Sequence, residues 1–165
     1  MRNRLGSIAT VVFGVASLLA LALVVVSQTS CAQAPEGERA NAENAAAIRA
    51  VIDAQAAAWN RGDVEGYMDG YERSDQTVFV SGDQITRGWQ TVLDRYKKSY
   101  DTREKMGTLN FSELEIKPLS AFYAVASGRW QLTRTADTPH GRFTLIFRKT
   151  SAGWRIVHDH TSSAS

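Results

Sequence analysis

The chain carries its most reactive-looking side chains near the C-terminus, in the run His158-Asp159-His160. The surrounding residues predict a strand, in which successive side chains alternate between the two faces. His158 and His160 then project to one face, and Asp159 projects to the other. Two imidazoles on one face can ligate a metal ion or act as general bases. His158 and His160 are therefore the candidate catalytic residues, and Asp159 cannot easily assist either of them.

A metal site would need further ligands beside these two histidines. The sequence offers His140, in a predicted turn, and scattered carboxylates, and the spacing matches no recognised zinc pattern. A general base would need a carboxylate partner such as Asp53, Asp63 or Asp75. The alternative interpretation is a histidine that forms structural hydrogen bonds at a sheet edge or an interface. We predict no metal and no cofactor, and we keep acid–base chemistry as an alternative function.

Aromatic side chains form the second group with functional potential. Most of them must pack in the core, where such side chains dominate burial. Small residues at Ala124, Ala126 and Gly128 leave space beside them, so a mostly apolar pocket is expected. Such a pocket suits a small apolar or aromatic molecule. For Gln55, a hydrogen bond to a buried backbone group is an equally good interpretation. The predicted ligand-binding residues are Gln55, Trp59, Tyr67, Phe79, Tyr96, Trp130 and Phe143.

Three helices must position these side chains. The first begins with Asn41 or Asn44 as its N-cap, keeps apolar residues at steps of three and four, and ends at Gly62. A short second helix runs from Val64 to about Tyr71, and a third begins after Gly88. Strands are predicted at 77–80, 84–86, 109–116, 122–134, 142–149 and 154–160. Helices followed by long antiparallel strands predict an α+β fold, with the helices over the apolar face of one sheet.

The charge balance and the cysteine content argue against some classes of function. Without Arg2 and Arg4, 17 basic residues stand against 17 acidic ones, and no basic patch is evident, so nucleic acid is an unexpected partner. The single cysteine, Cys31, precedes the predicted domain. The domain must therefore fold without a disulfide and without thiolate chemistry.

The N-terminal residues 1–32 predict a signal peptide or lipoprotein leader, and hence an exported protein. Arg2 and Arg4 precede an almost uninterrupted apolar run from Ile8 to Val26. Three interpretations stay open: cleavage before Gln33, lipidation of Cys31, and an uncleaved membrane anchor. Residues 33–41 are expected to form a flexible spacer and residues 42–165 the domain. Contact with a membrane is expected only through the N-terminal segment.

Four runs of sequence resemble successive motifs of the nuclear transport factor 2-like superfamily. They are AWNRGDVEGYMDGY, TVFVSGDQITRG, GRFTLIFRK and WRIVHDHTSS. Within the superfamily, the chain is most similar to the SnoaL-like and uncharacterised bacterial groups and to the association domain of calcium/calmodulin-dependent kinase II. The resemblance implies a cone, in which a strongly curved antiparallel sheet wraps around a long helix, as in a cystatin-like roll. It also implies a cavity at the open end and a homodimer or larger ring.

The ketosteroid isomerases of this superfamily offer a chemical test of the resemblance. The positions of their catalytic tyrosine and two acids fall on Gln55, Val80 and Leu145 in this chain. None of these side chains transfers a proton, so the isomerase mechanism is not carried over, and fold alone does not specify a reaction. The expected function is an exported domain that binds a small molecule without catalysis. The alternatives are an isomerase, dehydratase or hydrolase with a histidine base, and a homo-oligomeric assembly domain.

Overall fold

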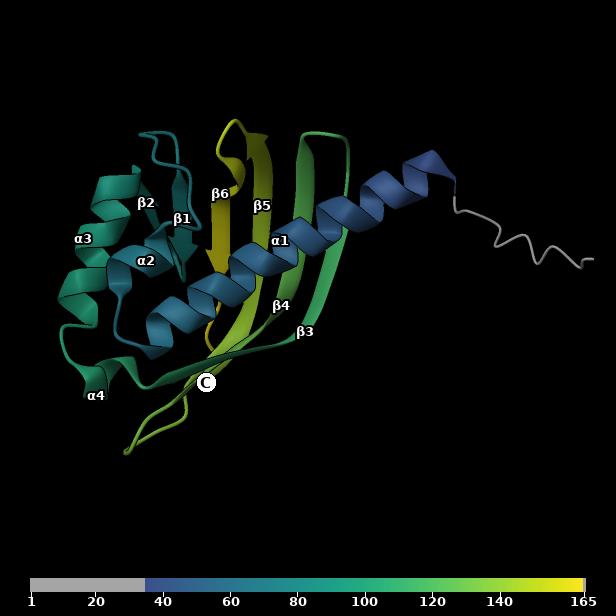
Figure 1. The fold of residues 1–165 in the computed structure, drawn as a ribbon. Coiled ribbons are helices and arrows are strands. Elements are labelled where there is room, and N and C mark those ends of the chain that lie inside the picture. Colours follow the sequence, from purple (N-terminus) through teal and green to yellow (C-terminus); the bar gives the residue numbers. More distant parts are fainter. Residues whose placement is uncertain (1–34, 165) are drawn as a thin grey trace, which may run out of the picture. The chain divides into compact units, whose positions relative to one another are not determined.

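The computed structural model describes residues 35–164 (Figure 1). The predicted leader, including Cys31, lies outside the described residues. Within residues 35–164, no helix combines the length and the apolar character needed to cross a bilayer.

The long helix α1 spans Glu36–Asn60 and therefore begins earlier than the sequence indicated. The prediction of a flexible spacer over residues 33–41 is wrong from Glu36 onward. Pro35 precedes the helix, and Glu36 and Glu38 lie in its first turn, where carboxylates interact favourably with the helix dipole. In the first turns of α1, residues of high helix propensity outweigh the low propensity of Gly37, although these turns are exposed.

The C-terminal half of α1 faces the core. Its buried residues repeat at steps of three and four, which is the pattern of a helix with one apolar face. They are Ile48, Ile52, Gln55, Ala58 and Trp59.

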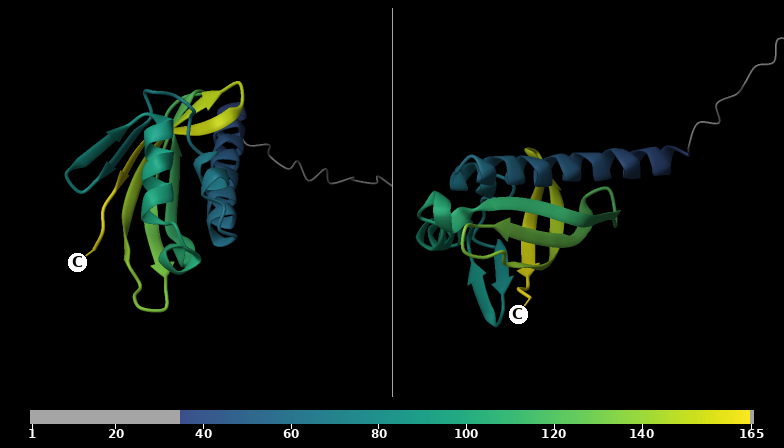
Figure 2. Two further views of the ribbon diagram at one scale, coloured as in Figure 1. Left: turned by 90° about the vertical axis from the view of Figure 1, so that its left-hand side faces the viewer. Right: turned by 90° about the horizontal axis from the view of Figure 1, so that it is seen from below.

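Three shorter helices complete the helical part of residues 35–164. They are α2 (Val64–Met68), α3 (Trp89–Ser99) and α4 (Arg103–Met106), of which α4 was not predicted. In Figures 1 and 2, α1 crosses the face of the sheet, while α2 and α3 lie near its β1–β2 end.

The described part of the chain forms one six-stranded sheet with the order β2-β1-β6-β5-β4-β3. Its strands are β1 (Val78–Ser81), β2 (Gln84–Arg87), β3 (Thr108–Pro118), β4 (Tyr123–Thr133), β5 (His140–Thr150) and β6 (Gly153–Thr161). All neighbouring pairs are antiparallel except β1 and β6, which run parallel. The predicted antiparallel α+β fold is confirmed, and this one parallel pair is the exception.

Two irregularities bend the sheet. The register of β3 against β4 shifts between Ser112 and Glu115, where Glu113 has a φ of 51°. The register of β6 against β5 shifts because Ile146 faces His158 while Phe147 faces Ile156, so Val157 is an extra residue on β6. Bulges of this kind bend a strand and increase its twist. They help to give the sheet its curvature around the helices.

The end of α1 is fastened to the first long strand by Asn60. Its Nδ2 donates a 3.0 Å hydrogen bond to the carbonyl of Leu109, and its Oδ1 accepts a 2.7 Å bond from the Leu109 amide. Arg103 donates to the carbonyls of Trp59 and Asn60, the last residues of the helix. The side chain of Asn60 therefore pairs with β3 as a neighbouring strand would.

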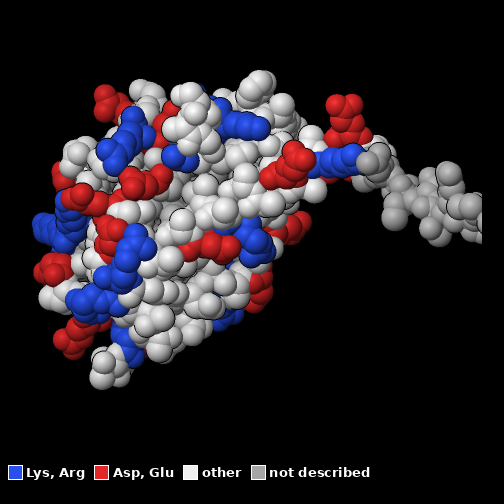
Figure 3. All heavy atoms as spheres, viewed as in Figure 1, with Lys and Arg blue, Asp and Glu red and all other residues white. Residues whose placement is uncertain are grey.

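The turn after Asn60 starts α2 immediately. Gly62 has a φ of 88°, which favours glycine. Asp63 accepts a 2.7 Å hydrogen bond from the Gly66 amide and so caps α2. This bond, together with the Arg61 guanidinium, lowers the pKa of Asp63. On the face of the molecule shown in Figure 3, acidic and basic side chains are interspersed.

Candidate functional site

A cavity of about 170 Å³ lies between the helices and the inner face of the sheet. All seven predicted ligand-binding residues line it: Gln55, Trp59, Tyr67, Phe79, Tyr96, Trp130 and Phe143. Their position is as the sequence indicated, and their role in binding stays a prediction. Helix α1, the α2 region, α3 and strands β1, β3, β4, β5 and β6 all contribute to the lining.

Aromatic rings form much of the wall. The ring of Trp59 lies edge-on to three tyrosines, with centroid distances of 5.1 Å to Tyr67, 6.0 Å to Tyr96 and 4.7 Å to Tyr100. Phe79 on β1 meets Tyr96 in the same manner at 5.7 Å. Aromatic pairs prefer such edge contacts. The cluster is a packed wall, because each ring is held by at least one other.

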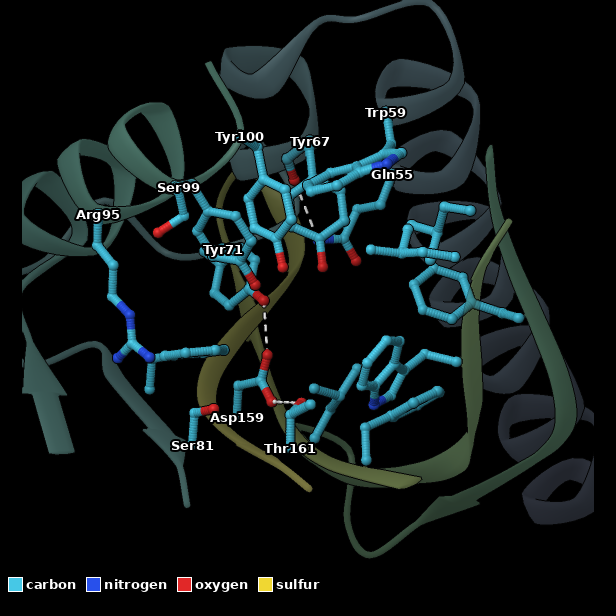
Figure 4. A pocket seen from close by; sticks show the side chains of 18 of the residues that line it. Gln55, Trp59, Tyr67, Tyr71, Ser81, Arg95, Ser99, Tyr100, Asp159 and Thr161 are labelled. Atoms are coloured by element: carbon cyan, nitrogen blue, oxygen red, sulfur yellow. Dashed lines mark hydrogen bonds between the residues drawn. The ribbon is translucent and has the colours of Figure 1, made fainter. Parts of the chain in front are cut away.

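Asp159 is the acidic residue of this wall, and the sequence pattern had suggested no role for it. It is only 3% exposed and stands in the middle of the sheet, opposite Phe79 on β1 and Leu145 on β5. The hydroxyls of Tyr71 and Thr161 each donate a 2.7 Å hydrogen bond to it, one to Oδ2 and one to Oδ1 (Figure 4). Among the ion pairs of the described residues, none involves Asp159.

The environment of Asp159 changes its acidity. Burial raises the pKa of Asp159 from its usual 3.8 to about 6, while the hydrogen bonds from Tyr71 and Thr161 and the charge of His160 lower it. A buried carboxylate without a cation favours its protonated form. Asp159 can therefore take up or release a proton close to neutral pH.

The tyrosines around the carboxylate are neutral hydrogen-bonding groups. Burial is the largest cause of the raised pKa of Tyr67, Tyr71 and Tyr96, and the charge of Asp159 raises all three further. Of the three, Tyr71 donates its hydroxyl directly to Asp159 and so connects the carboxylate to the helical side of the cavity.

Gln55 forms a hydrogen bond to a buried backbone group and also lines the cavity. Its Nε2 donates a 3.0 Å hydrogen bond to the backbone carbonyl of Tyr67. Its amide oxygen points into the cavity (Figure 4). The side chain fits because residue 70 is glycine: a Cβ there would lie 2.5 Å from Cδ of Gln55.

Arg95 on α3 supplies the cationic group of the lining. Its guanidinium lies 5.0 Å from the centroid of Phe79 and donates a 2.9 Å hydrogen bond to Thr86 Oγ1. It lies on the same side of the cavity as Ser81 (Figure 4). Arg95 is therefore held by an aromatic ring and a hydroxyl, not by Asp159.

The predicted catalytic histidines do not line this cavity. Asp159 points inward, so its neighbours His158 and His160 project to the other face, where His158 is half-buried and His160 exposed. The structure therefore does not bring either imidazole to the cavity, and a role for them as general bases stays a prediction. No ion pair between either histidine and a carboxylate occurs among residues 35–164. These residues also contain no group of three potential metal ligands.

The bulge at Val157 explains this placement. Trp154 and Ile156 are buried, and unbroken alternation from them would place His158 and His160 inside. The extra residue reverses the alternation and turns Asp159 inward. Tyr71 and Thr161 were not predicted as site residues either. One signal in the sequence could have found Asp159 and Thr161: strand alternation places these two side chains on one face and both histidines on the other.

Comparison with known proteins agrees with this architecture. The family model of the SnoaL-like domain matches residues 48–165. A nuclear transport factor 2-like protein of unknown function from Shewanella oneidensis MR-1 shares 42% sequence identity with a TM-score of 0.68, covering 70% of this chain and 96% of its own. No protein with a curated description matches the sequence.

Two more distant structures share the fold. A ketosteroid isomerase-like protein from Erwinia carotovora atroseptica SCRI1043 is 23% identical, with a TM-score of 0.59, over 74% of this chain and 98% of its own. A candidate calcium/calmodulin-dependent protein kinase II association domain from Xanthomonas campestris is 16% identical, with a TM-score of 0.58, over 71% and 85%. From the family match and the 42% identical relative, the chain belongs to the SnoaL-like domain family of the nuclear transport factor 2-like superfamily.

Proposed function

We propose that this domain binds a small, mostly apolar organic molecule inside the aromatic cavity. The observation that carries the proposal is the cavity itself, about 170 Å³ of space walled by aromatic rings in an otherwise packed core. Ligand sites are typically apolar hollows with a few polar groups that fix orientation. Here Asp159, Gln55 and the tyrosine hydroxyls are those groups. An apolar cavity of roughly 150 Å³ holds one benzene molecule, so the ligand has about one ring and a short substituent.

The test is a binding screen with single-ring compounds, monitored by NMR shift changes and thermal unfolding. Ser99→Trp places a bulky side chain at a lining position on α3, and Lys98→Trp alters an exposed neighbour that does not line the cavity. We expect ligands that bind the wild type and Lys98→Trp equally and bind Ser99→Trp at least tenfold more weakly. A screen without a single saturable ligand would refute the proposal.

A second candidate is an acid–base enzyme of the isomerase type, with Asp159 as the proton-transferring group. The supporting observation is the raised pKa of Asp159, about 6, beside a hydrogen-bonding tyrosine. The 23% identical Erwinia protein is named for such an enzyme, but fold alone does not transfer an activity. The assay is exchange of the α-protons of cyclic ketones in D₂O. Exchange that is catalysed by the wild type and lost in Asp159→Asn would establish this function, and no exchange would exclude it for these ketones.

We also propose that the protein is exported and that it forms a homodimer. The charged and apolar residues 1–32 support export, and mass spectrometry of the mature N-terminus would distinguish cleavage, lipidation at Cys31 and retention. A homodimer is the expected state because of the superfamily resemblance. Light scattering at micromolar concentration tests it, and a monomer would contradict it.

A further inference from the structure

The acceptor atoms of the cavity are only partly used by the protein. Each carboxylate oxygen of Asp159 accepts one hydrogen bond, from Tyr71 or Thr161, and so keeps a second acceptor position. Gln55 uses its amide nitrogen on the Tyr67 carbonyl, and its amide oxygen points into the same space. A ligand that brings several N–H donors would satisfy these atoms.

The groups that face Asp159 leave its charge without a cation. Its two strand neighbours are apolar, Phe79 on β1 and Leu145 on β5. Besides Arg95 on α3, the titratable groups on the helical side are the phenols of Tyr67, Tyr71, Tyr96 and Tyr100, all with raised pKa values. Because its pKa is about 6, the buried carboxylate is mainly ionised at pH 7.5, and these phenols do not neutralise it.

The two basic side chains nearby do not supply that cation. His160 projects from β6 to the opposite face of the sheet, although its charge lowers the pKa of Asp159. Arg95 is held by Phe79 and Thr86. A buried charge without a partner is costly, and a bound cation removes that cost.

The aromatic wall favours the same ligand. Trp59, Tyr67, Tyr96 and Phe79 all line the cavity. Ring faces attract organic cations, and the attraction grows when the cation is shielded from water. A neutral alcohol would donate to Asp159 but would not balance its charge. An anionic ligand would be repelled by the carboxylate and could pair only with Arg95.

We infer that the cavity selects an organic ligand with a protonated amine, whose ammonium group pairs with Asp159 while its apolar body lies against the aromatic wall. This inference rests on the proposed ligand-binding function and specifies its ligand class. The unpaired carboxylate with its free acceptor positions and the ring wall are two separate observations that favour this ligand.

The test compares three compounds of similar shape by calorimetry or NMR titration at pH 7.5: phenethylamine, 2-phenylethanol and 3-phenylpropionate. We expect phenethylamine to bind at least tenfold more tightly than the alcohol and the carboxylate to bind most weakly. Asp159→Asn should bring the amine to within about threefold of the alcohol. His160→Gln, which removes the adjacent ionisable group on the outer face, should keep the preference.

The thermal unfolding of Asp159→Asn is recorded first, to show that the variant folds. A second test uses the wild type alone and so does not depend on the variant. Between pH 5 and pH 7.5 the affinity for phenethylamine should rise at least fivefold, because Asp159 ionises in this range while the amine stays protonated. The affinity for 2-phenylethanol should stay constant. Equal binding of amine and alcohol, or tightest binding of the carboxylate, would overturn the amine inference and leave the ligand-binding proposal intact. Binding of none of the three, in a screen that also yields no other ligand, would overturn both.

Discussion

The hydroxyl of Tyr71 donates a 2.7 Å hydrogen bond to Oδ2 of Asp159, and this bond joins two residues that are 88 positions apart in the chain. Tyr71 follows α2, while Asp159 stands in the middle of the sheet. The pair therefore connects the helical side of the cavity to its floor and fixes one carboxylate oxygen. Several expected outcomes depend on it.

The first prediction concerns Tyr71→Phe. Loss of the hydroxyl should raise the pKa of Asp159 above about 6, because the Tyr71 bond lowers it in the wild type. Stability at pH 7.5 should fall by about 1.5–3 kcal/mol, the usual range for a hydrogen bond to a charged group. Carbon-detected NMR titration and urea unfolding measure both quantities. Tyr123→Phe, at an exposed position, is the control, and an unchanged Asp159 pKa in Tyr71→Phe would contradict the assignment.

The second prediction is a pH dependence of stability. The pKa of Asp159 is 3.8 in its usual state and about 6 when folded, so the folded protein binds more protons than the unfolded chain between these values. Its contribution to the free energy of unfolding therefore decreases as pH rises from about 4 to about 6, by about 3 kcal/mol in total. Urea unfolding of wild type and Asp159→Asn across pH 3.5–7.5 isolates this contribution. If the free energies of unfolding of the two proteins change with pH in parallel, this prediction is refuted.

The third prediction uses the tight space at Gly70. A methyl group there would lie 2.5 Å from Cδ of Gln55, so Gly70→Ala should displace that side chain and cost about 1–3 kcal/mol. Gly37→Ala is the matched control, since a methyl group at that position would meet nothing within 4 Å and alanine favours helix α1. It should stabilise by about 0.5–1 kcal/mol. Equal effects of the two variants on the unfolding midpoint would contradict the packing described for Gln55.

The fourth prediction concerns Asn60. Asn60→Ala removes both hydrogen bonds to the Leu109 backbone and should destabilise the domain by about 1–3 kcal/mol. Asn60→Asp should cost at least as much, because a carboxylate cannot donate to the Leu109 carbonyl. Asn44→Ala, at a surface position of α1 with a single long bond to Lys149, is the control and should change stability by less than about 0.5 kcal/mol. A similar loss in Asn44→Ala would contradict the Leu109 pairing as the cause, because helix propensity alone favours alanine over asparagine.

The fifth prediction separates the two faces of β6. His158→Ala and His160→Ala should leave ligand affinity within about twofold of the wild type, because both side chains project away from the cavity. Asp159→Ala should reduce the affinity for an amine at least tenfold. Titration of the three variants with phenethylamine makes the comparison. A tenfold loss of phenethylamine affinity in either histidine variant would show that the imidazole contributes to the binding site.

Helical periodicity and strand alternation predict the α+β class and which side chains face the core, whereas the cone was expected from the superfamily resemblance. Trp59 and Gln55 lie on the buried face of α1, and Phe143 lies on the inner face of β5, because local pattern determines which side of an element is buried. The start of α1 is harder to predict, because Pro35 and Gly37 are typical of a loop. The helix-forming residues around them outweigh both.

The acidic centre of the site could not be located in the same way. Its inward direction depends on one extra residue, Val157, in the pairing of β6 with β5. Such a bulge depends on contacts between strands and leaves no periodic signal within the strand itself. The parallel pairing of Phe79 with Asp159 depends on residues 80 positions apart. Sequence patterns identify the faces of elements more reliably than the register between them.

The place of β6 in the sheet has a consequence for biosynthesis. This strand lies between β1 and β5, yet it is the last of the six to be translated. As long as the nascent chain has not emerged from the ribosome as far as Thr161, the β1–β2 hairpin lacks the strand that joins it to the rest of the sheet, and the site lacks its carboxylate. Ligand-binding competence should therefore arise in a single late step of synthesis, instead of growing gradually with chain length.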